Sequence, residues 1–217
     1  MVKPAQAFFD AYFNLYPPRR VFTPENFPDL DPAQAGLPLL PGSLQQADYK
    51  AFELLFSIQL PQSFILWHKE YYFLDGDCSI LSLPASDPRF PLKDLQQRVD
   101  WYIAGQLIPH HLYPFGEAGN DLGPLVFDGR QEVTGNNFPV RAYDHEFGGD
   151  LAGLTSIIFS SFDKLLECTT YYLKELKFRK NFEIIPDFFS IDPAGAGLTG
   201  VKYWLEYASM LKATESI

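Results

Sequence analysis

The densest group of chemically capable side chains in this sequence is Asp144-His145-Glu146. If a strand over residues 139–145 continues through Glu146, side chains alternate between its two faces, and both carboxylates share one face. Such a pair could carry out general acid–base chemistry or bind a cation. No further histidine or cysteine follows at ligand spacing nearby, so we favour a structural or binding role over catalysis or a metal site.

The adjacent histidines His110-His111 and the glycine-rich stretch 116–123 are two further candidates. Neighbouring side chains of an extended strand point to opposite faces, so one metal ion could hardly be bound by both histidines, and we interpret them as loop or edge residues. The glycine-rich stretch lacks the Gly-Lys-Ser/Thr ending of a phosphate-binding loop and carries two carboxylates where phosphate would lie. We interpret it as a tight acidic turn.

The sequence also lacks the signatures of common hydrolases. It contains no Gly-x-Ser-x-Gly nucleophile motif and no His-Glu-x-x-His zinc motif. Its two cysteines, Cys78 and Cys168, are far apart in the chain, which argues against a disulfide framework or a thiolate metal site and favours two buried, reduced side chains. The sequence therefore predicts a protein that is not an enzyme and has no cofactor or metal.

Negative charge is concentrated in residues 101–153. This stretch has two basic residues, Arg130 and Arg141, against seven acidic ones, and so supplies −5 of the formal net charge of −10. The acidic residues are Glu117, Asp121, Asp128, Glu132, Asp144, Glu146 and Asp150. An acidic surface repels nucleic-acid phosphates and attracts a cation or a basic protein. We therefore expect no direct nucleic-acid binding.

Composition indicates a folded protein outside the membrane. The chain has 217 residues, of which 47% are hydrophobic, with 20 Phe and 12 Tyr, so it has enough apolar surface to build a sizeable core. It has no apolar run long enough to span a bilayer, and its N-terminus does not resemble a signal peptide. We expect a cytoplasmic protein.

Hydrophobic periodicity predicts an α+β fold, with helices first, strands in the middle and helices last. A central, mostly antiparallel or mixed sheet flanked by helices is expected within a single domain, 1–217. Its core is placed at 44–180, with an N-terminal helix and Pro-rich arm at 1–43 and a C-terminal extension with a terminal helix at 181–217. The predicted helices cover 4–16, 44–58, 64–71, 92–103, 162–176 and 201–211, and the predicted strands cover 79–83, 112–115, 125–128 and 139–145.

Capping patterns support two of these helices. Ser43 followed by Gln46 predicts the start of the second helix, and Ser160 followed by Asp163 predicts the start of the long helix near 162. Residues 17–42 are rich in proline and lack periodicity, so they are predicted to form an arm without regular structure. Residues 181–200 form a passage rich in proline and glycine, in which no helix or strand is predicted.

Five short segments occur in an order that resembles the SUKH superfamily. They are Ile-Gln-Leu-Pro-Gln-Ser-Phe at 58–64, Pro-Phe-Gly-Glu-Ala-Gly-Asn-Asp at 114–121, the strand at 125–128, Pro-Val-Arg-Ala-Tyr-Asp-His-Glu at 139–146, and the start of a closing helix at 158–166. The resemblance implies an α+β domain with one central sheet and no catalysis. Bacterial members of that superfamily are typically immunity proteins that neutralise toxins, often nucleases or deaminases, while others are regulatory interaction modules.

These observations lead to a favoured function and two alternatives. An immunity protein would dock its acidic 117–150 region on a basic toxin through Glu117, Asp121, Asp144 and Glu146. Tyr143, Tyr113 and Phe147 would serve as aromatic anchors, and Asp144 has an alternative role in holding local hydrogen bonds. One alternative is a regulatory or scaffolding module with a housekeeping partner. The other is a hydrolase that uses Asp144 and Glu146.

Overall fold

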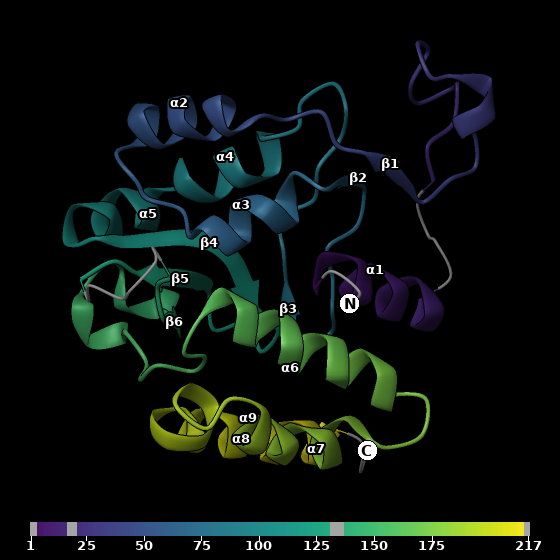
Figure 1. Cartoon of the computed structure of the whole chain (residues 1–217). Coiled ribbons are helices and arrows are strands. Elements are labelled where there is room, and N and C mark those ends of the chain that lie inside the picture. Colours follow the sequence, from purple (N-terminus) through teal and green to yellow (C-terminus); the bar gives the residue numbers. More distant parts are fainter. Residues whose placement is uncertain (1–3, 17–20, 131–136, 215–217) are drawn as a thin grey trace.

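The chain folds into an α+β structure, as its periodicity predicts. The computed structural model describes residues 4–16, 21–130 and 137–214 (Figure 1). Its strands form two antiparallel sheets, one with the order β1-β2 and one with the order β3-β4-β5-β6. Across these described ranges, no helix is both long enough and apolar enough to cross a bilayer.

The predicted bounds agree to within one residue for the helices over 4–16 and 162–176 and for the strand over 125–128, whereas the strand predicted over 139–145 covers only Val140–Ala142. The strands are β1 (Leu39–Pro41), β2 (Tyr71–Phe73), β3 (Leu81–Ser82), β4 (Leu112–Ala118), β5 (Pro124–Asp128) and β6 (Val140–Ala142). The helices are α1 (Pro4–Leu15), α2 (Gln46–Phe56), α3 (Gln62–His68), α4 (Lys93–Val99), α5 (Tyr102–Leu107), α6 (Phe162–Glu175), α7 (Asn181–Ile184), α8 (Phe188–Ile191) and α9 (Val201–Thr214).

The larger sheet is covered on both faces. Leu125, Phe127, Val140 and Ala142 belong to the main hydrophobic cluster, which also contains side chains of α3 and α6. The alternate residues, including Val126 of β5 and Tyr143, form a second cluster with side chains of α5. Every residue of β5 is buried. A strand covered on both faces has no solvent side, so its inward and outward residues cannot be told apart by polarity.

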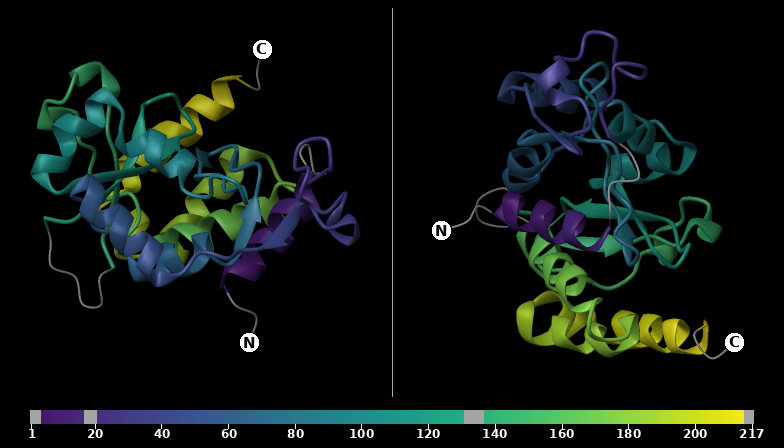
Figure 2. Two further views of the ribbon diagram at one scale, coloured as in Figure 1. Left: turned by 90° about the horizontal axis from the view of Figure 1, so that it is seen from above. Right: turned by 90° about the vertical axis from the view of Figure 1, so that its right-hand side faces the viewer.

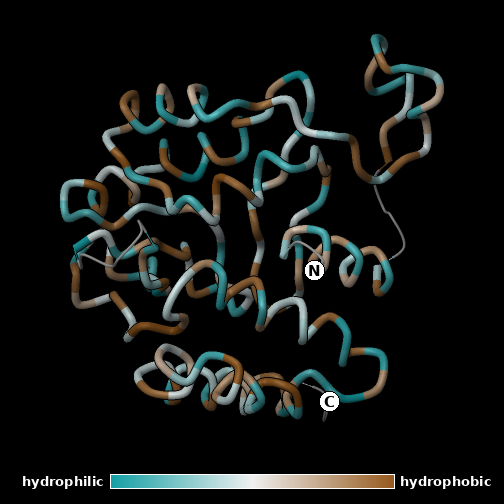
Figure 3. The backbone as a smooth tube through the Cα atoms, in the orientation of Figure 1, coloured by the Kyte–Doolittle hydropathy of each residue, from teal (hydrophilic) through white to brown (hydrophobic). Residues whose placement is uncertain are grey.

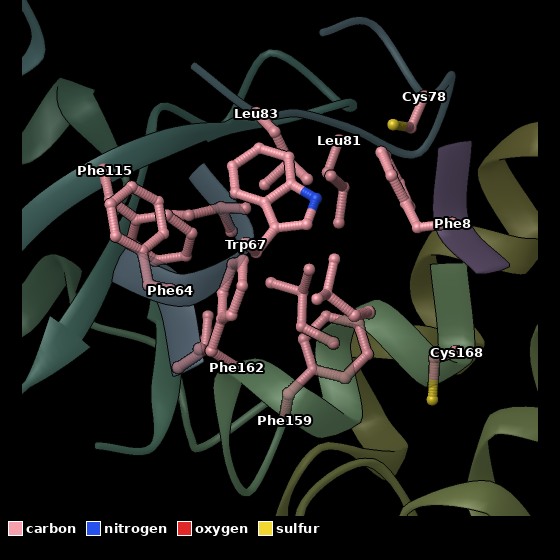
Figure 4. Close-up of a cluster of buried hydrophobic side chains, with 14 of the residues drawn as sticks. Phe8, Phe64, Trp67, Cys78, Leu81, Leu83, Phe115, Phe159, Phe162 and Cys168 are labelled. Atoms are coloured by element: carbon pink, nitrogen blue, oxygen red, sulfur yellow. The ribbon is translucent and has the colours of Figure 1, made fainter. Parts of the chain in front are cut away.

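The centre of the main cluster is the Phe64 ring on α3. Its centroid lies 5.9 Å from that of Phe115 on β4, 5.6 Å from that of Phe127 on β5 and 5.2 Å from that of Phe162 on α6. The side chains of Phe64, Phe115 and Phe162 converge in Figure 4. Pro61 is the N-cap of α3, so this helix begins directly after the Leu60-Pro61 pair.

Trp67, one turn further along α3, joins this centre to the first helix. Its ring lies 5.8 Å from Phe8 and 6.1 Å from Phe9 of α1, and 5.3 Å from Phe73 of β2. The N-terminal helix is therefore part of the core. Cys78 and Cys168 are both buried and free, as predicted, and burial raises the pKa of both thiols.

Residues 181–214 form a helical layer against α6, on the side away from α2 and α4 (Figures 1 and 2). The Pro/Gly-rich passage 181–200, for which no element was predicted, contains α7, α8 and two short helical turns. Hydrophobic and hydrophilic residues are interspersed along α6 (Figure 3). Its buried residues, which run from Phe162 to Leu173, form a wide stripe that packs on both the sheet and the C-terminal layer. Trp204 of α9 donates from Nε1 to the carbonyl of Ile158, 3.0 Å away.

A buried carboxylate fixes the C-terminal layer to the rest of the fold. Asp192 is 0% exposed and accepts hydrogen bonds from the backbone N and the Oγ of Ser160, at 2.7 and 2.6 Å. It also accepts from the amides of Gly195 and Ala196, at 3.1 and 3.3 Å. Each carboxylate oxygen thus has two donors, which compensates for the loss of water around the charge.

Several boundaries differ from the predicted ones for identifiable reasons. The helix predicted over 92–103 is two helices, because the backbone leaves helical geometry between α4 and α5 at Asp100 and Trp101. Helix α2 has its N-cap at Gln45, two residues after the predicted Ser43, with the Gln45 backbone N bonded to Asp48 Oδ2 at 2.7 Å. Helix α6 is capped by Ser161.

The stretch 17–42 also differs from its prediction of no regular structure. The described part, 21–42, contains a 3-10 turn at Pro32–Gln34 and strand β1. Phe22 and Phe27 pack with Leu40 and Tyr72 in a small separate cluster. We call residues 21–38 the N-terminal arm. It lies beside the β1-β2 sheet at the edge of the molecule (Figure 1).

His68, at the end of α3, is completely buried. Its Nδ1 lies 2.7 Å from Tyr49 Oη on α2, and its Nε2 has no hydrogen-bond partner among the described residues. Burial lowers the pKa of His68 from 6.5 to about 3. The folded state therefore holds this histidine in its neutral form.

We expect His68 to make the protein less stable in mild acid. Between pH 6.5 and about 3 the unfolded chain binds a proton that the folded chain excludes, so the free energy of unfolding falls by up to about 1.4 kcal/mol per pH unit. Above pH 6.5 this loss of stability is absent, because His68 is then neutral in both the folded and the unfolded chain. Urea unfolding of the wild type and of His68→Gln at about pH 6 and about pH 4 checks this. An equal pH slope in both proteins would contradict it.

We expect Asp192→Ala to lower the free energy of unfolding by about 3 kcal/mol, because four buried donors lose their acceptor. Chemical unfolding followed by tryptophan fluorescence measures the change. Glu206→Ala on exposed α9 is the matched control, with an expected change within about 0.5 kcal/mol. Similar stability of the two variants would show that the carboxylate does not fix the C-terminal layer.

Candidate functional site

Two loops after β4 and β6 lie against each other and carry the exposed acids of the 117–150 region. We call residues 119–123 and 144–151 the acidic loop pair. The backbone N and the ring Nδ1 of His145 lie 2.9 and 2.8 Å from the carbonyl oxygen of Leu122. Gly123 has a φ of +132°, and a Cβ there would lie 2.7 Å from the carbonyl oxygen of Tyr143. This close approach requires glycine.

Tyr143 holds the second loop from inside the protein. Its hydroxyl donates to the carbonyl of Asp150, 2.9 Å away, and accepts from the amide of Gly149, 2.7 Å away. Its ring packs with side chains of α5 and β5. The prediction that Tyr143 and Tyr113 offer their rings to a partner is wrong, since they are only 0% and 3% exposed. Tyr143 positions the loop instead.

The carboxylates of Asp144 and Asp150 cap the two turns of this loop. Asp144 Oδ1 accepts from the amide of Glu146 at 3.0 Å, and Asp150 Oδ1 accepts from the amide of Ala152 at 2.9 Å. The strand ends at Ala142 and a 3-10 turn follows over His145–Phe147. The expectation that Asp144 and Glu146 share a strand face is therefore wrong, whereas the alternative role of Asp144 in local hydrogen bonding is confirmed.

Arg130 and Arg141 both bind Asp128, the one acid that is buried among the described residues of the region. The Asp128 carboxylate accepts from Arg130 Nε and Nη2 at 2.8 Å each and from Arg141 Nε at 2.6 Å. Burial alone would raise the pKa of Asp128, but the hydrogen bonds from the two guanidinium groups outweigh it and the pKa is lowered. Neither arginine makes an ion pair with the acidic loop pair.

The remaining acids of the region differ in their charge environment. Asp121, Glu146 and Asp150 are exposed, and the described residues place no Lys or Arg in ion-pair contact with them or with Asp144. Glu132 lies outside the described residues. The acidic loop pair thus presents carboxylates that make no ion pair with a Lys or Arg of the described residues.

Glu117 does not belong with these unpaired acids. It is on β4, and its Oε1 lies 3.3 Å from Nη1 of Arg98, which also contacts Asp94 at 3.2 Å. Desolvation raises the pKa of Glu117, while the nearby Arg98 acts in the opposite direction. The expectation that Glu117 adds free negative charge to a docking surface is corrected by this ion pair.

Apolar side chains lie exposed within the acidic loop pair. Phe147, which was predicted as an anchor, is 47% exposed, and Leu151 is 37% exposed. The sequence analysis did not predict Leu151 as an exposed contact residue. Its position directly after Asp150, in a loop that contains glycines, could have indicated this exposure. An exposed aromatic ring among unpaired carboxylates is the combination that protein interfaces use, with the ring for affinity and the charges for steering.

The other candidates for chemistry take structural positions. His110 ends a 3-10 turn, and His111 follows with a φ of 56° and its Nδ1 3.1 Å from Tyr113 Oη. Residues 116–118 belong to strand β4, so only 119–123 form the predicted acidic turn. The described part of the chain contains no group of three or more His, Cys, Asp or Glu side chains arranged to hold a metal ion.

Comparison with protein-family models, with curated proteins and with solved structures finds no match to this chain.

We expect Tyr143→Phe to loosen the loop 144–151 while the rest of the fold stays intact. The variant loses the hydroxyl that bonds Gly149 and Asp150, which lowers the local stability of the loop by about 1–2 kcal/mol. Amide hydrogen exchange at Gly149 measures this as faster exchange. Tyr102→Phe, whose ring is 70% exposed, is the control. Unchanged exchange at Gly149 would refute the positioning role of Tyr143.

Proposed function

We propose that this protein is a non-catalytic binding module of the SUKH type, an immunity protein that binds and neutralises a basic toxin domain in the cytoplasm. Nuclease and deaminase domains are the expected partners, because proteins that act on nucleic acid carry positive charge around their substrate grooves. The acidic loop pair would occupy such a groove in place of the nucleic acid and so prevent substrate from entering.

The observation that carries this proposal is the set of unpaired carboxylates at Asp121, Asp144, Glu146 and Asp150. Exposed charges usually have nearby opposite charges, which reduce the potential that a partner meets. Here the local arginines are bonded to Asp128, and Arg98 is bonded to Glu117. The potential of the acidic loop pair is therefore available to an incoming cationic surface.

The way the loops are held also suits a docking surface. Their shape is fixed by backbone and tyrosine hydrogen bonds, for example from His145 to Leu122 and from Gly149 to Tyr143. A surface held in its bound shape loses little conformational entropy on binding. Phe147 and Leu151 supply the apolar area that charge steering alone does not provide.

We expect the variant Asp121→Asn/Glu146→Lys to associate with the toxin at least about tenfold more slowly at low salt, because electrostatic steering is lost. The test co-expresses the protein with the product of the neighbouring open reading frame and scores cell survival. Association rates of the purified pair are then measured at several salt concentrations. The wild type should protect cells, with an association rate that falls steeply as salt rises.

Glu25→Lys/Asp29→Asn is the matched control, because it changes the net charge equally at two exposed positions of the N-terminal arm. It should associate and protect like the wild type. Full protection and unchanged association by the Asp121→Asn/Glu146→Lys variant would place the docking face elsewhere. A housekeeping protein as the bound partner, with no protection from a toxin, would support the regulatory alternative instead.

A further inference from the structure

A hollow of about 540 Å³ lies between the N-terminal arm and helix α4. This volume falls in the range of small-molecule sites, about 300–1,000 Å³. Three of its walls are aromatic: Phe27 from the arm, Phe73 at the end of β2 and Phe90 in the loop before α4. Phe27 and Phe73 are buried and Phe90 is 60% exposed. None of the residues that line it belongs to the acidic loop pair.

The acidic side chains of the hollow are already engaged by groups of the protein. Asp87 Oδ1 accepts from the amides of Arg89 and Phe90, at 2.8 and 3.1 Å. Asp94 Oδ2 accepts from the amide of Ala85 at 2.9 Å and from Arg98 at 3.2 Å. These carboxylates fix the loop before α4 and the start of that helix.

The cationic side chains of the hollow are less engaged. Arg89 has 53% of its side chain exposed, and its Nε is 3.7 Å from Asp87, a distance at the long end for an ion pair. Its guanidinium lies 4.4 Å from the centre of the Phe27 ring, which orients the group without using its outer N–H donors. Lys93 is exposed and its ammonium lies 5.8 Å from the Phe90 ring, with no acid in ion-pair contact among the described residues.

We propose that this hollow binds a small organic acid, with its carboxylate held by Arg89 and Lys93 and its aromatic body packed against the exposed ring of Phe90. The guanidinium fork of arginine matches the two oxygens of a carboxylate, and a flat apolar wall suits an aromatic ring. The site is independent of the proposed docking function, so the failure of either leaves the other standing.

The test titrates 3-phenylpropionate and its uncharged analogue 3-phenylpropan-1-ol into the full-length protein, by calorimetry and by NMR. We expect the acid to bind saturably with a Kd of about 1 mM or lower. The alcohol, which cannot pair with the two cations, should bind at least about fivefold more weakly. Shifted NMR signals should include the methyl of Thr23, which lines the hollow, and the Phe90 ring and exclude the acidic loop pair.

Variants assign the binding to the two cations. Arg89→Gln/Lys93→Gln should weaken binding of the acid at least about fivefold, while Lys50→Gln on exposed α2 should leave it unchanged. The proposal is overturned if the alcohol binds as tightly as the acid, if the double variant binds like the wild type, or if no saturation is seen up to about 10 mM. Because NMR mapping uses the wild type, it decides the question even if the double variant loosens the arm.

Discussion

Burial of the aromatic face of helix α3 is the constraint on which the remaining packing depends. Phe64 contacts rings on β4, β5 and α6, and Trp67 contacts rings on α1 and β2. A helix of only seven residues is too short to be stable alone. It exists because each fully buried aromatic side chain contributes about 1.5–3 kcal/mol, and its position in turn fixes how the sheet, the first helix and the long helix meet.

That packing decides where charge can appear on the surface. The face of the sheet opposite α3 is closed by α5, so Asp128 at the end of β5 is buried and draws Arg130 and Arg141 to itself. The acids on the loops beyond the sheet are left without those arginines. The carboxylates of Asp144 and Asp150 cap the turns of these loops. Each cap is a hydrogen bond from a backbone amide, so the carboxylate keeps its negative charge. Because Asp128 binds both arginines inside the protein, the carboxylates of the acidic loop pair remain free to bind a partner.

The sequence was sufficient to predict most elements but not which faces of them are covered. The bounds of the helices predicted over 4–16, 162–176 and 201–211 agree well with those of α1, α6 and α9, because amphipathic periodicity and helix caps are local signals. Leu54 and Leu55 are apolar residues of the helix predicted over 44–58 and yet are 75% and 74% exposed. Tyr143 was expected at the surface and is buried, since no local signal shows that α5 covers that side of the sheet. The pairing of Glu117 with Arg98 and the role of Asp192 are likewise contacts between distant segments, which a one-dimensional pattern does not contain.

The bond between Asp192 and Ser160 spans 32 positions of the chain. During synthesis the ribosome releases the sheet and the start of α6 before it releases their acceptor, so the Ser160 amide and hydroxyl must first be hydrated. They become dry only when residue 192 has emerged and the C-terminal helices dock. The loss of water from the start of α6 is therefore one of the last steps of folding during synthesis. A nascent chain stalled before this aspartate would expose the apolar side of α6 to chaperones.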